Sequence, residues 1–374
     1  MADYSWRAPG SPAQQPRQQE EPMATYLCLV AGRLDDVLTS LVVDDESGVV
    51  RVAGRTATGP RPMPVVVDAA RALVHVGNGG DPHSITTVTW APDGSTSPVV
   101  TVDCPIAQTY MSVVGDLLMA VSYAGCELAC ARLGADGLVD ASSWQVVRTG
   151  HQPHCIVPSP DGRHAYLSLL GEDRLAGFRV AGGRLVPDES LGARLDPGAG
   201  PRHIRLSPDG SSLYVTEEFG GRVVHLRRDS DSGVLEPSGS TMDCVAPEAG
   251  LRRGVFVPPG RRPAVDESER RIWGSDLVIA PDGAWAVASE RRASTLTMAA
   301  LGPDGRFGAR LARIVTQPQP RGIGLIGPHL VIAGAELGDA ASIHRAGPEG
   351  LSELAVVDGL GGPVWMESVP LDPA

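Results

Sequence analysis

Short runs of alternating hydrophobic and polar residues recur along this chain, and turn-forming residues separate them. The pattern is clearest from residue 201 to 228, where it predicts strands at 203–207, 213–216 and 223–228. A Pro-Asp-Gly triplet at 208–210 and a Gly-Gly pair at 220–221 supply the turns between them. Because strands joined by tight turns run antiparallel, we expect this stretch to fold as an antiparallel meander.

Similar units follow one another along the rest of the chain. They begin near residues 25, 62, 109, 152, 201, 275 and 319. Pro-Asp-Gly triplets in the fourth and fifth units begin at residues 160 and 208, which are 48 residues apart. A repeat of this length with three or four strands is typical of a β-propeller blade. The sequence therefore predicts an all-β protein, a propeller of about seven blades.

The two ends of the repeated region are expected to complete one blade together. The segment from residue 361, GGPVWMES, is typical of an innermost blade strand, but no partner strands follow it. The strands from residue 25 lack a strand before them. Pairing these two segments would close the ring and remove the open sheet edges. We thus expect a single propeller domain over residues 24–374 that is closed by strands from both termini.

Two segments do not fit the repeat. Residues 1–23 are rich in Gln, Pro, Arg and Ser and contain no apolar run, so we expect a disordered tail and neither a secretion signal nor an anchor. A proline-rich, charged insertion near residues 258–271 separates the fifth unit from the sixth. Whether this insertion covers the channel as a lid is left open.

Composition limits the classes of partner. The chain has 44 acidic and 32 basic side chains, and its net charge of −12 argues against nucleic-acid and anionic-membrane partners. No stretch approaches the roughly 18 apolar residues of a membrane span. The cysteines follow no metal-binding spacing, so we expect buried free thiols in a reducing, cytoplasmic location, without a metal or cofactor. They are Cys28, Cys104, Cys126, Cys130, Cys155 and Cys244.

Candidate chemistry gathers at one mouth of the channel. Residues at the start of each innermost strand and at the end of each second strand should face the same mouth, because the two strands are antiparallel. Side chains of both signs are expected there, which suits binding an anion and moving a proton. The fourth and fifth units contribute His151, Gln152, His154, Arg202, His203, Glu217 and Glu218. The sixth and seventh contribute Asp276, Glu290, Arg291, Arg292, Gln319, Arg321 and Glu336.

Each of these residues also has a structural interpretation. His154 could cap the turn beside Pro153, and Arg202 could be a strut that bonds backbone carbonyls of the next blade. Glu217 and Glu218 could form a solvated pair at the rim. Since adjacent strand residues point to opposite sides, at most one of these two carboxylates should face the channel.

The motifs resemble those of a known family. G-P-R-H at 200–203, Glu217-Glu218, S-E-R at 289–291 and Q-P-R-G at 319–322 are similar to motifs of the seven-bladed propeller lactonases. That family includes 6-phosphogluconolactonases and fungal-type 3-carboxy-cis,cis-muconate lactonising enzymes. In the family pattern, Asn replaces both Glu217 and Glu290, so this chain is more acidic there.

The resemblance implies an active site with a small anionic substrate. By position, it implies catalytic roles for His154, Arg202, Glu218 and Arg291. The arginines would bind a carboxylate or phosphate and stabilise an oxyanion, while His154 and Glu218 would act as general acid and base. We expect the substrate to be surrounded by His151, His203, Glu217, Gln319 and Arg321.

Three functions remain open at this point. The first is hydrolysis of a sugar-type lactone, and the second is a cyclase or cycloisomerase that makes or opens a lactone with the same residues. The third is a non-catalytic propeller that binds a protein partner, which an exposed apolar patch at the mouth would favour. No G-x-S-x-G elbow, H-E-x-x-H pair or phosphate-binding loop of the G-x-x-x-x-G-K-[ST] type supports another catalytic class. The sequence does not predict the oligomeric state.

Overall fold

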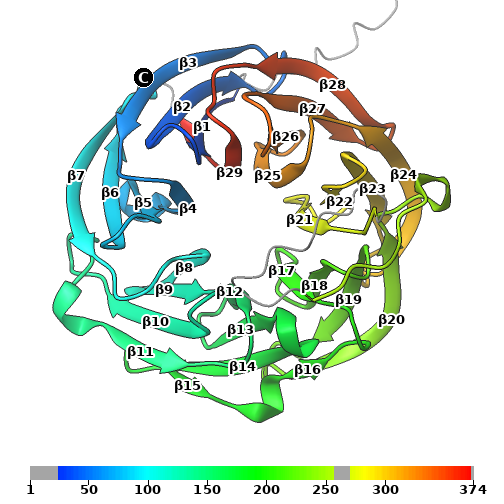
Figure 1. Ribbon diagram of the computed structural model, residues 1–374, viewed down its shortest axis with the longest axis horizontal. Coiled ribbons are helices and arrows are strands. Elements are labelled where there is room, and N and C mark those ends of the chain that lie inside the picture. Colours follow the sequence, from blue (N-terminus) through cyan, green and yellow to red (C-terminus); the bar gives the residue numbers. More distant parts are fainter. Residues whose placement is uncertain (1–23, 257–269, 372–374) are drawn as a thin grey trace, which may run out of the picture.

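The computed structural model describes residues 24–256 and 270–371 of the chain. In these residues, strands form seven sheets that surround a central channel like the blades of a propeller (Figure 1). Six sheets have four strands in a simple antiparallel order, and the fourth blade has a fifth short strand beside β14. The predicted seven-bladed, all-β architecture is confirmed. The predicted tail at 1–23 and residues 258–269 of the predicted insertion lie outside the described residues.

The strands of each blade are numbered in chain order, from the channel outward. The first blade, after β29 described below, contains β1 (Thr25–Gly32), β2 (Val37–Asp44) and β3 (Val50–Ala57). The second contains β4 (Pro62–Asp68), β5 (Leu73–Asn78), β6 (Ser84–Trp90) and β7 (Thr96–Asp103). The third contains β8 (Tyr110–Val114), β9 (Leu117–Ser122), β10 (Glu127–Arg132) and β11 (Gln145–Arg148).

The remaining blades repeat this arrangement. The fourth contains β12 (Pro153–Pro158), β13 (His164–Leu169), β14 (Arg174–Ala181), β15 (Arg184–Pro187) and β16 (Ala193–Arg194). The fifth contains β17 (Pro201–Leu206), β18 (Ser212–Glu217), β19 (Arg222–Arg228) and β20 (Leu235–Asp243). The sixth contains β21 (Gly274–Ile279), β22 (Trp285–Glu290), β23 (Thr295–Leu301) and β24 (Phe307–Val315). The seventh contains β25 (Pro320–Ile326), β26 (Leu330–Ala335), β27 (Ala341–Gly347) and β28 (Gly350–Val357).

Helical structure in the described chain is limited to single turns of 3₁₀-helix between strands. These are η1 (Ala69–Arg71), η2 (Ala141–Ser143), η3 (Leu170–Glu172), η4 (Glu189–Leu191) and η5 (Pro247–Ala249). None of the described helices has the length and apolar character needed to cross a membrane. The three strands predicted between 201 and 228 are β17, β18 and β19, and the structure adds the outermost strand β20 to that blade.

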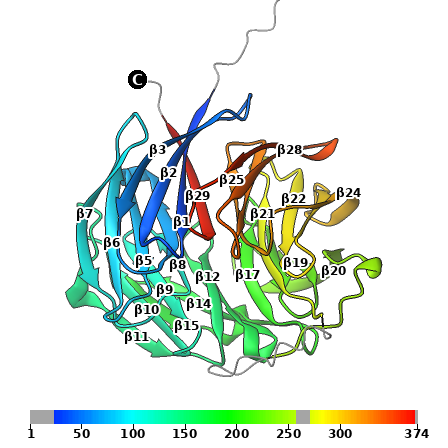
Figure 2. The same cartoon turned by 45° about the horizontal axis from the view of Figure 1, so that its top comes forward.

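The ring closes by pairing the two ends of the chain. Strand β29 (Pro363–Leu371) is the innermost strand of the first blade and pairs antiparallel with β1, with Leu29 opposite Glu367. Blue β1 and red β29 lie side by side in both views (Figures 1 and 2). The predicted closure by both termini is therefore confirmed.

The core lies between neighbouring blades, where the faces of the sheets pack together. Every residue of the second strands β13, β18 and β22 is buried, as expected for strands covered on both faces. One large apolar cluster extends through several blades and includes Leu29, Tyr166 and Trp365. Five of the six cysteines are buried and Cys126 is partly buried, and all six are free thiols.

A bulge recurs at the start of five innermost strands. In β12 the register shifts between Pro153 and Ile156, and equivalent shifts occur at the starts of β4, β17, β21 and β25. A bulge inserts an extra residue and redirects the neighbouring side chains. The residues within these bulges include His154, Arg202, His203, Asp276 and Arg321. The fold thus uses one local distortion to direct five predicted residues of the mouth.

Side-chain hydroxyls of the second strands hold three of these bulges. The backbone N–H of His203 donates to Thr216 Oγ1 at 2.9 Å, and the N–H of Asp276 donates to Ser289 Oγ at 3.1 Å. Thr216 Oγ1 also donates to the carbonyl of Ser275 in the next blade at 3.1 Å. Ser168 makes the same two kinds of contact one blade earlier. Each hydroxyl therefore fixes a bulge, and those of Thr216 and Ser168 also link two blades.

Candidate active site

A pocket of about 460 Å³ opens where the bulged strands meet the channel mouth. Six ionisable side chains from the fourth to the seventh blades line it, and smaller or apolar residues complete it. The ionisable residues are His154, Arg202, Glu218, Arg291, Arg321 and Glu336. The others are Met63, Ala107, Thr109, Ser122, Tyr123, Ala124 and Trp273.

His154 is a buried imidazole at the pocket wall. Only 5% of the residue is exposed, and its Nδ1 has no hydrogen-bond partner in the described part of the chain. The edge of the Tyr123 ring packs against it, with 5.9 Å between ring centroids. Burial, and then the positive charge of Arg202, lowers the pKa of His154 well below its usual range. His154 is therefore neutral at neutral pH and can accept a proton.

Arg202 combines a structural bond with a place in the pocket. Its side chain is 2% exposed, and its Nη1 donates to the carbonyl of Ser275 at 2.9 Å, so it does serve as a strut between blades. Its Nε lies 3.0 Å from Glu218 Oε2, in an ion pair that lacks hydrogen-bond angles. Burial lowers the pKa of Arg202, but an arginine still keeps its charge at neutral pH. The Arg202–Glu218 pair places a cation and a carboxylate together beside the cavity.

A second charge cluster joins the sixth and seventh blades. Arg321 Nη1 donates to Glu336 Oε1 at 2.8 Å, and Arg291 forms an ion pair with Glu336 Oε2. Arg33, on the loop after β1, also donates to Glu336 Oε1. Burial alone would raise the pKa of Glu336, but the arginines outweigh it and lower this pKa to about 2. Glu336 is consequently an anion that holds three arginines at the mouth.

Apolar groups form the rest of the lining. The guanidinium carbon of Arg291 lies 3.4 Å from the centroid of the Trp273 ring, a cation–π contact. Met63 begins the bulge of β4 at the position that His154 and Arg202 occupy in their strands. Strands β4 and β8 lie across the channel from β21 and β25 (Figure 1). Sequence reasoning missed Met63, Tyr123 and Trp273, although Met63, like His154 and Arg202, directly follows a Pro at the start of an innermost strand.

The predicted residues divide into two groups. His154, Arg202, Glu218, Arg291 and Arg321 come together in the pocket. The other four predicted residues do not line the pocket. His203 lies behind it, and His151, Gln319 and Glu217 lie elsewhere. His151 is exposed and its backbone N–H donates to Glu172, while Gln319 is fixed by a bond from its backbone N–H to Ser294. The third is Glu217.

Glu217 is buried away from the pocket. It is 1% exposed, and its Oε2 accepts a hydrogen bond from Arg222 Nε at 2.8 Å. Glu218, the next residue, lines the pocket instead, which agrees with the expectation that at most one of the two faces the channel. The acidic residue Glu290 is also turned inward, where it accepts hydrogen bonds from the backbone N–H groups of Trp273 and Ala293. Neither carboxylate adds negative charge to the cavity wall.

Within residues 24–256 and 270–371, no group of three or more His, Cys, Asp and Glu side chains could hold a metal ion. The charged groups in the lining of the pocket are three arginines and two carboxylates, and a neutral histidine lies beside them.

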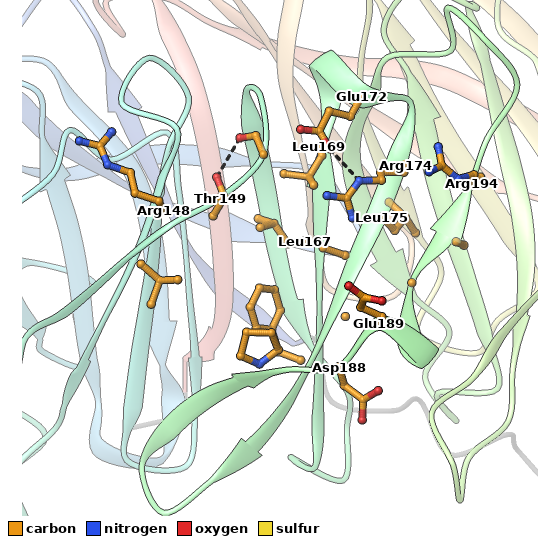
Figure 3. Close-up of a pocket in the computed structure, with 18 residues that line it drawn as sticks. Arg148, Thr149, Leu167, Leu169, Glu172, Arg174, Leu175, Asp188, Glu189 and Arg194 are labelled. Atoms are coloured by element: carbon orange, nitrogen blue, oxygen red, sulfur yellow. Dashed lines mark hydrogen bonds and ion pairs between the residues drawn. The ribbon is translucent and has the colours of Figure 1, made fainter.

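A larger groove lies elsewhere, between the third and fourth blades (Figure 3). Its volume is about 760 Å³, and its lining includes Arg148, Arg174 and Glu172. Glu172 is already occupied by Arg174 Nε at 2.7 Å and by the N–H of His151 at 2.8 Å. The described residues that line this groove include no His, Cys, Ser or Tyr. Its described lining has no counterpart of the buried His154, so we assign the chemistry to the smaller cavity.

The fold and the site together define a seven-bladed β-propeller with a buried, charged pocket at one mouth of its channel. The family model described as "Lactonase, 7-bladed beta-propeller" matches residues 29–367. The chain belongs to this family, as its motifs indicated.

Relatives and solved structures agree with this assignment. A 6-phosphogluconolactonase of Cronobacter sakazakii is 28% identical over 310 residues, covering 81% of this chain and 86% of that protein. One of Pectobacterium carotovorum is 28% identical over 275 residues, covering 72% and 76%. The periplasmic gluconolactonase of Pseudomonas aeruginosa has the same fold, with a TM-score of 0.76 at 21% identity and coverage of 92% and 99%. A protein from Lactobacillus plantarum gives a TM-score of 0.79 at 17% identity, covering 93% and 100%.

Proposed function

We propose that this protein hydrolyses a phosphorylated sugar lactone, with 6-phosphogluconolactone as the first candidate. The main support for this proposal is that neutral His154 lines the same buried pocket as Arg202, Arg291 and Arg321. A proton acceptor and cationic groups are what ester-type hydrolysis needs, because water must be activated and the oxyanion stabilised. The names of the curated relatives support the choice of substrate.

His154 is proposed as the group that activates water. As water attacks the lactone carbonyl carbon, His154 takes one water proton and the carbonyl oxygen becomes an oxyanion. The ring carbon–oxygen bond then breaks, and the same proton passes from His154 to the departing ring oxygen. The product is an open hydroxy acid, so the proton balance closes without a cofactor. The lowered pKa of His154 keeps the imidazole unprotonated at neutral pH, before water attacks.

Arginine charge would bind the substrate and the oxyanion. Arg202 and Arg291 are the groups proposed to face the oxyanion, and Arg321 is proposed to bind the phosphate with them. Glu218 lies against Arg202 and is the second proton-transfer group of the proposal. Glu336 neutralises part of the positive charge of Arg291 and Arg321. The pocket therefore favours a substrate of modest negative charge. A phosphorylated sugar would be met in the cytoplasm, because such esters do not diffuse across membranes.

The experiment is to measure the hydrolysis of freshly generated 6-phosphogluconolactone, corrected for its spontaneous opening, beside unphosphorylated gluconolactone. Replacing Arg321 by Lys should raise KM for the phosphorylated lactone about tenfold, because a bidentate contact is lost. Arg227, an exposed arginine paired with Glu236, provides the matched Arg227→Lys control, which should change nothing. Equal turnover of both lactones by the wild type would reject the phosphate contact while leaving lactone hydrolysis in place.

A cyclase that closes or opens a lactone on an unsaturated carboxylate is the second candidate. The apolar lining of Met63, Tyr123 and Trp273 favours it, because a planar conjugated acid would pack there better than a sugar with several hydroxyl groups. Screening unsaturated dicarboxylates for loss of their ultraviolet absorbance would test this candidate. If the wild-type protein is inactive on both sugar lactones but removes this absorbance, the cyclase function replaces lactone hydrolysis as the proposal.

A further inference from the structure

Behind the pocket, His203 and Asp276 form a buried pair that the proposed reaction does not use. His203 Nδ1 lies 2.5 Å from Asp276 Oδ1, and the residues are 2% and 4% exposed. The pair bridges two blades, since His203 is in the bulge of β17 and Asp276 is in the bulge of β21. Neither residue lines the cavity. Their role must therefore be exerted through a neighbour.

The contacts of Asp276 hold its carboxylate in place from several sides. Oδ1 accepts hydrogen bonds from the N–H of Leu277 at 2.8 Å and from Arg205 Nη2 at 3.3 Å, in addition to the contact with His203. Oδ2 accepts a hydrogen bond from the N–H of Ile323, in the next blade, at 3.3 Å. Burial raises the pKa of Asp276, but His203 and Arg205 outweigh it, so the net shift is downward. Asp276 is thus an anion in a fixed orientation.

This fixed anion determines the tautomer of His203. Burial lowers the pKa of His203 to about 4, so the ring is neutral at neutral pH. A neutral imidazole carries one proton, and beside a carboxylate that proton is on Nδ1, where it can be donated. Nε2 is consequently an acceptor, and it is buried without a partner among the described residues. A buried acceptor without a donor destabilises a fold, so its retention needs a reason.

The neighbouring His154 gives a reason for keeping the Nε2 atom of His203 without a partner. The two imidazole rings lie 5.1 Å apart between centroids, tilted by 59°. His154 Nδ1 is likewise buried without a partner. The rings of Tyr110 and Trp365, at 5.5 and 5.8 Å from His203, confine His203 on other sides. Two imidazole nitrogens without a partner among the described residues are therefore held in neighbouring rings whose centroids lie 5.1 Å apart.

We propose that Asp276 and His203 are positioning residues for His154: Asp276 fixes the Nδ1–H tautomer of His203, and His203 Nε2 then accepts a hydrogen bond from His154 Nδ1–H. This bond would leave His154 Nε2 unprotonated and directed for proton transfer. When His154 takes a proton on Nε2 during turnover, its Nδ1–H remains bonded to His203, and the negative charge of Asp276 supports the imidazolium. No proton leaves the three groups, and the charge balance is restored when His154 returns its proton.

The substrate-free test uses nitrogen-15 NMR of labelled histidine at neutral pH. The chain has nine histidines, and His154→Gln and His203→Gln assign the two signals by their loss. In the wild type, both rings should be Nδ1–H tautomers. Asp276→Asn should leave His203 with mixed tautomers, because an amide can either donate to Nδ1 or accept from it. His203→Gln should likewise change the tautomer of His154.

The matched control is His344→Gln. His344 is fully buried like His203, but its partners are Ser342 and Thr316 outside the pocket. Its replacement should leave the His154 signal unchanged. A wild-type His203 that carries its proton on Nε2 would overturn the proposal without any variant having to fold. An unchanged His154 signal in His203→Gln would also overturn it.

A kinetic arm, which rests on the proposed lactonase function, measures the consequence of losing the pair. Asp276→Asn and His203→Gln should each lower kcat about 100-fold with KM within threefold, because substrate contacts remain while proton transfer is misdirected. A purely structural role would lower thermal stability and leave kcat of the folded fraction unaltered. If the wild type hydrolyses no lactone but the NMR results hold, the lactonase proposal fails and the positioning pair stands. If the wild type is active and both variants keep kcat within twofold, the pair is rejected.

Discussion

The carboxylate of Glu336 balances much of the positive charge at the mouth. It contacts Arg33, Arg291 and Arg321, and its own side chain is 5% exposed. Removing one partner of a buried ion pair leaves a charge without compensation, which typically costs several kcal/mol. Glu336 therefore supplies the negative charge that compensates for the arginines at the mouth.

Replacing Glu336 by Gln should lower the free energy of unfolding by about 3 kcal/mol, because Arg291 would remain buried without its counter-ion. Urea denaturation measures this change. The matched control is Glu236→Gln, which breaks an exposed pair with Arg227 and should cost less than about 1 kcal/mol. Equal losses in the two variants would contradict the assigned role.

Buried neutral histidines should make the protein sensitive to acid. Burial lowers the pKa values of His75, His203 and His344 to about 4, whereas an unfolded histidine titrates near 6.5. Between these two values the unfolded chain binds protons that the folded chain does not. The free energy of unfolding should thus fall as pH decreases from about 6.5 to about 4, by up to ~1.4 kcal/mol per pH unit for each histidine.

His344→Gln isolates one of these contributions, because His344 is remote from the pocket residues. Its slope of unfolding free energy against pH should be shallower than that of the wild type between pH 6.5 and 4.5. Urea denaturation at several pH values measures this slope, with the exposed His329→Gln as a control that should keep the wild-type slope. Identical slopes in wild type and His344→Gln would refute the explanation.

The sequence was sufficient to predict some pocket residues, but not others. His154, Arg202 and Arg321 could be placed because each follows a Pro at the start of an innermost strand, and strand direction fixes which end faces the mouth. Gln319 and Glu217 looked equivalent to them. The direction of a side chain at a strand end depends on bulges and on partners such as Arg222, which the spacing of residues does not reveal.

At the scale of elements, the recurring bulge is the feature that builds the site. The extra residue in each bulge redirects the side chains of His203 and Asp276. The bulge also leaves backbone N–H groups without a partner on the neighbouring strand, and the hydroxyls of the second strands accept hydrogen bonds from them. Alternation alone predicts a regular strand, so the bulges and their hydroxyl partners were not foreseen, although the three inner strands of the blade were.

Thr216→Val tests the contribution of one hydroxyl. The change keeps the shape of the side chain but leaves the N–H of His203 and the carbonyl of Ser275 without this partner, at a cost of about 2 kcal/mol. It should also lower lactone turnover, because Arg202 and His203 share the disturbed bulge. The control Thr89→Val loses a bond to the carbonyl of Ala72 on the second blade and should reduce stability alone. Turnover equal to that of the wild type in Thr216→Val would contradict this view of the bulge.

At the scale of the whole molecule, the ring depends on one strand supplied by the end of the chain. β29 pairs along the full length of β1 and contributes Trp365 to the core. This closure could be predicted from the sequence. The last strand of the chain has no partner strands after it, and the first strands lack an innermost strand before them. The apolar lining of Met63, Tyr123 and Trp273 was not predicted, because these residues come from the second, third and sixth blades and meet only once the ring is closed.

A chain ending at Leu360 should not form a stable monomer, because β1 would become an open edge strand and the Trp365 contacts would be lost. A chain ending at Leu371 retains β29 and serves as the control. Size-exclusion chromatography and thermal unfolding should show aggregation or a strongly lowered Tm only for the shorter chain. A monomeric shorter chain with the Tm of the control would contradict the proposed importance of closure.

The proposed reaction is the hydrolysis of a lactone in the mouth pocket, with His154 as the proton acceptor. The most direct measurement is the turnover of fresh 6-phosphogluconolactone by wild type, His154→Ala and the buried-histidine control His344→Ala, with spontaneous opening subtracted. The proposed reaction predicts that His154→Ala lowers kcat by about 10² to 10⁴, while His344→Ala retains wild-type kcat in its folded fraction. Turnover by His154→Ala at the wild-type rate, or equal losses in both folded variants, would contradict it.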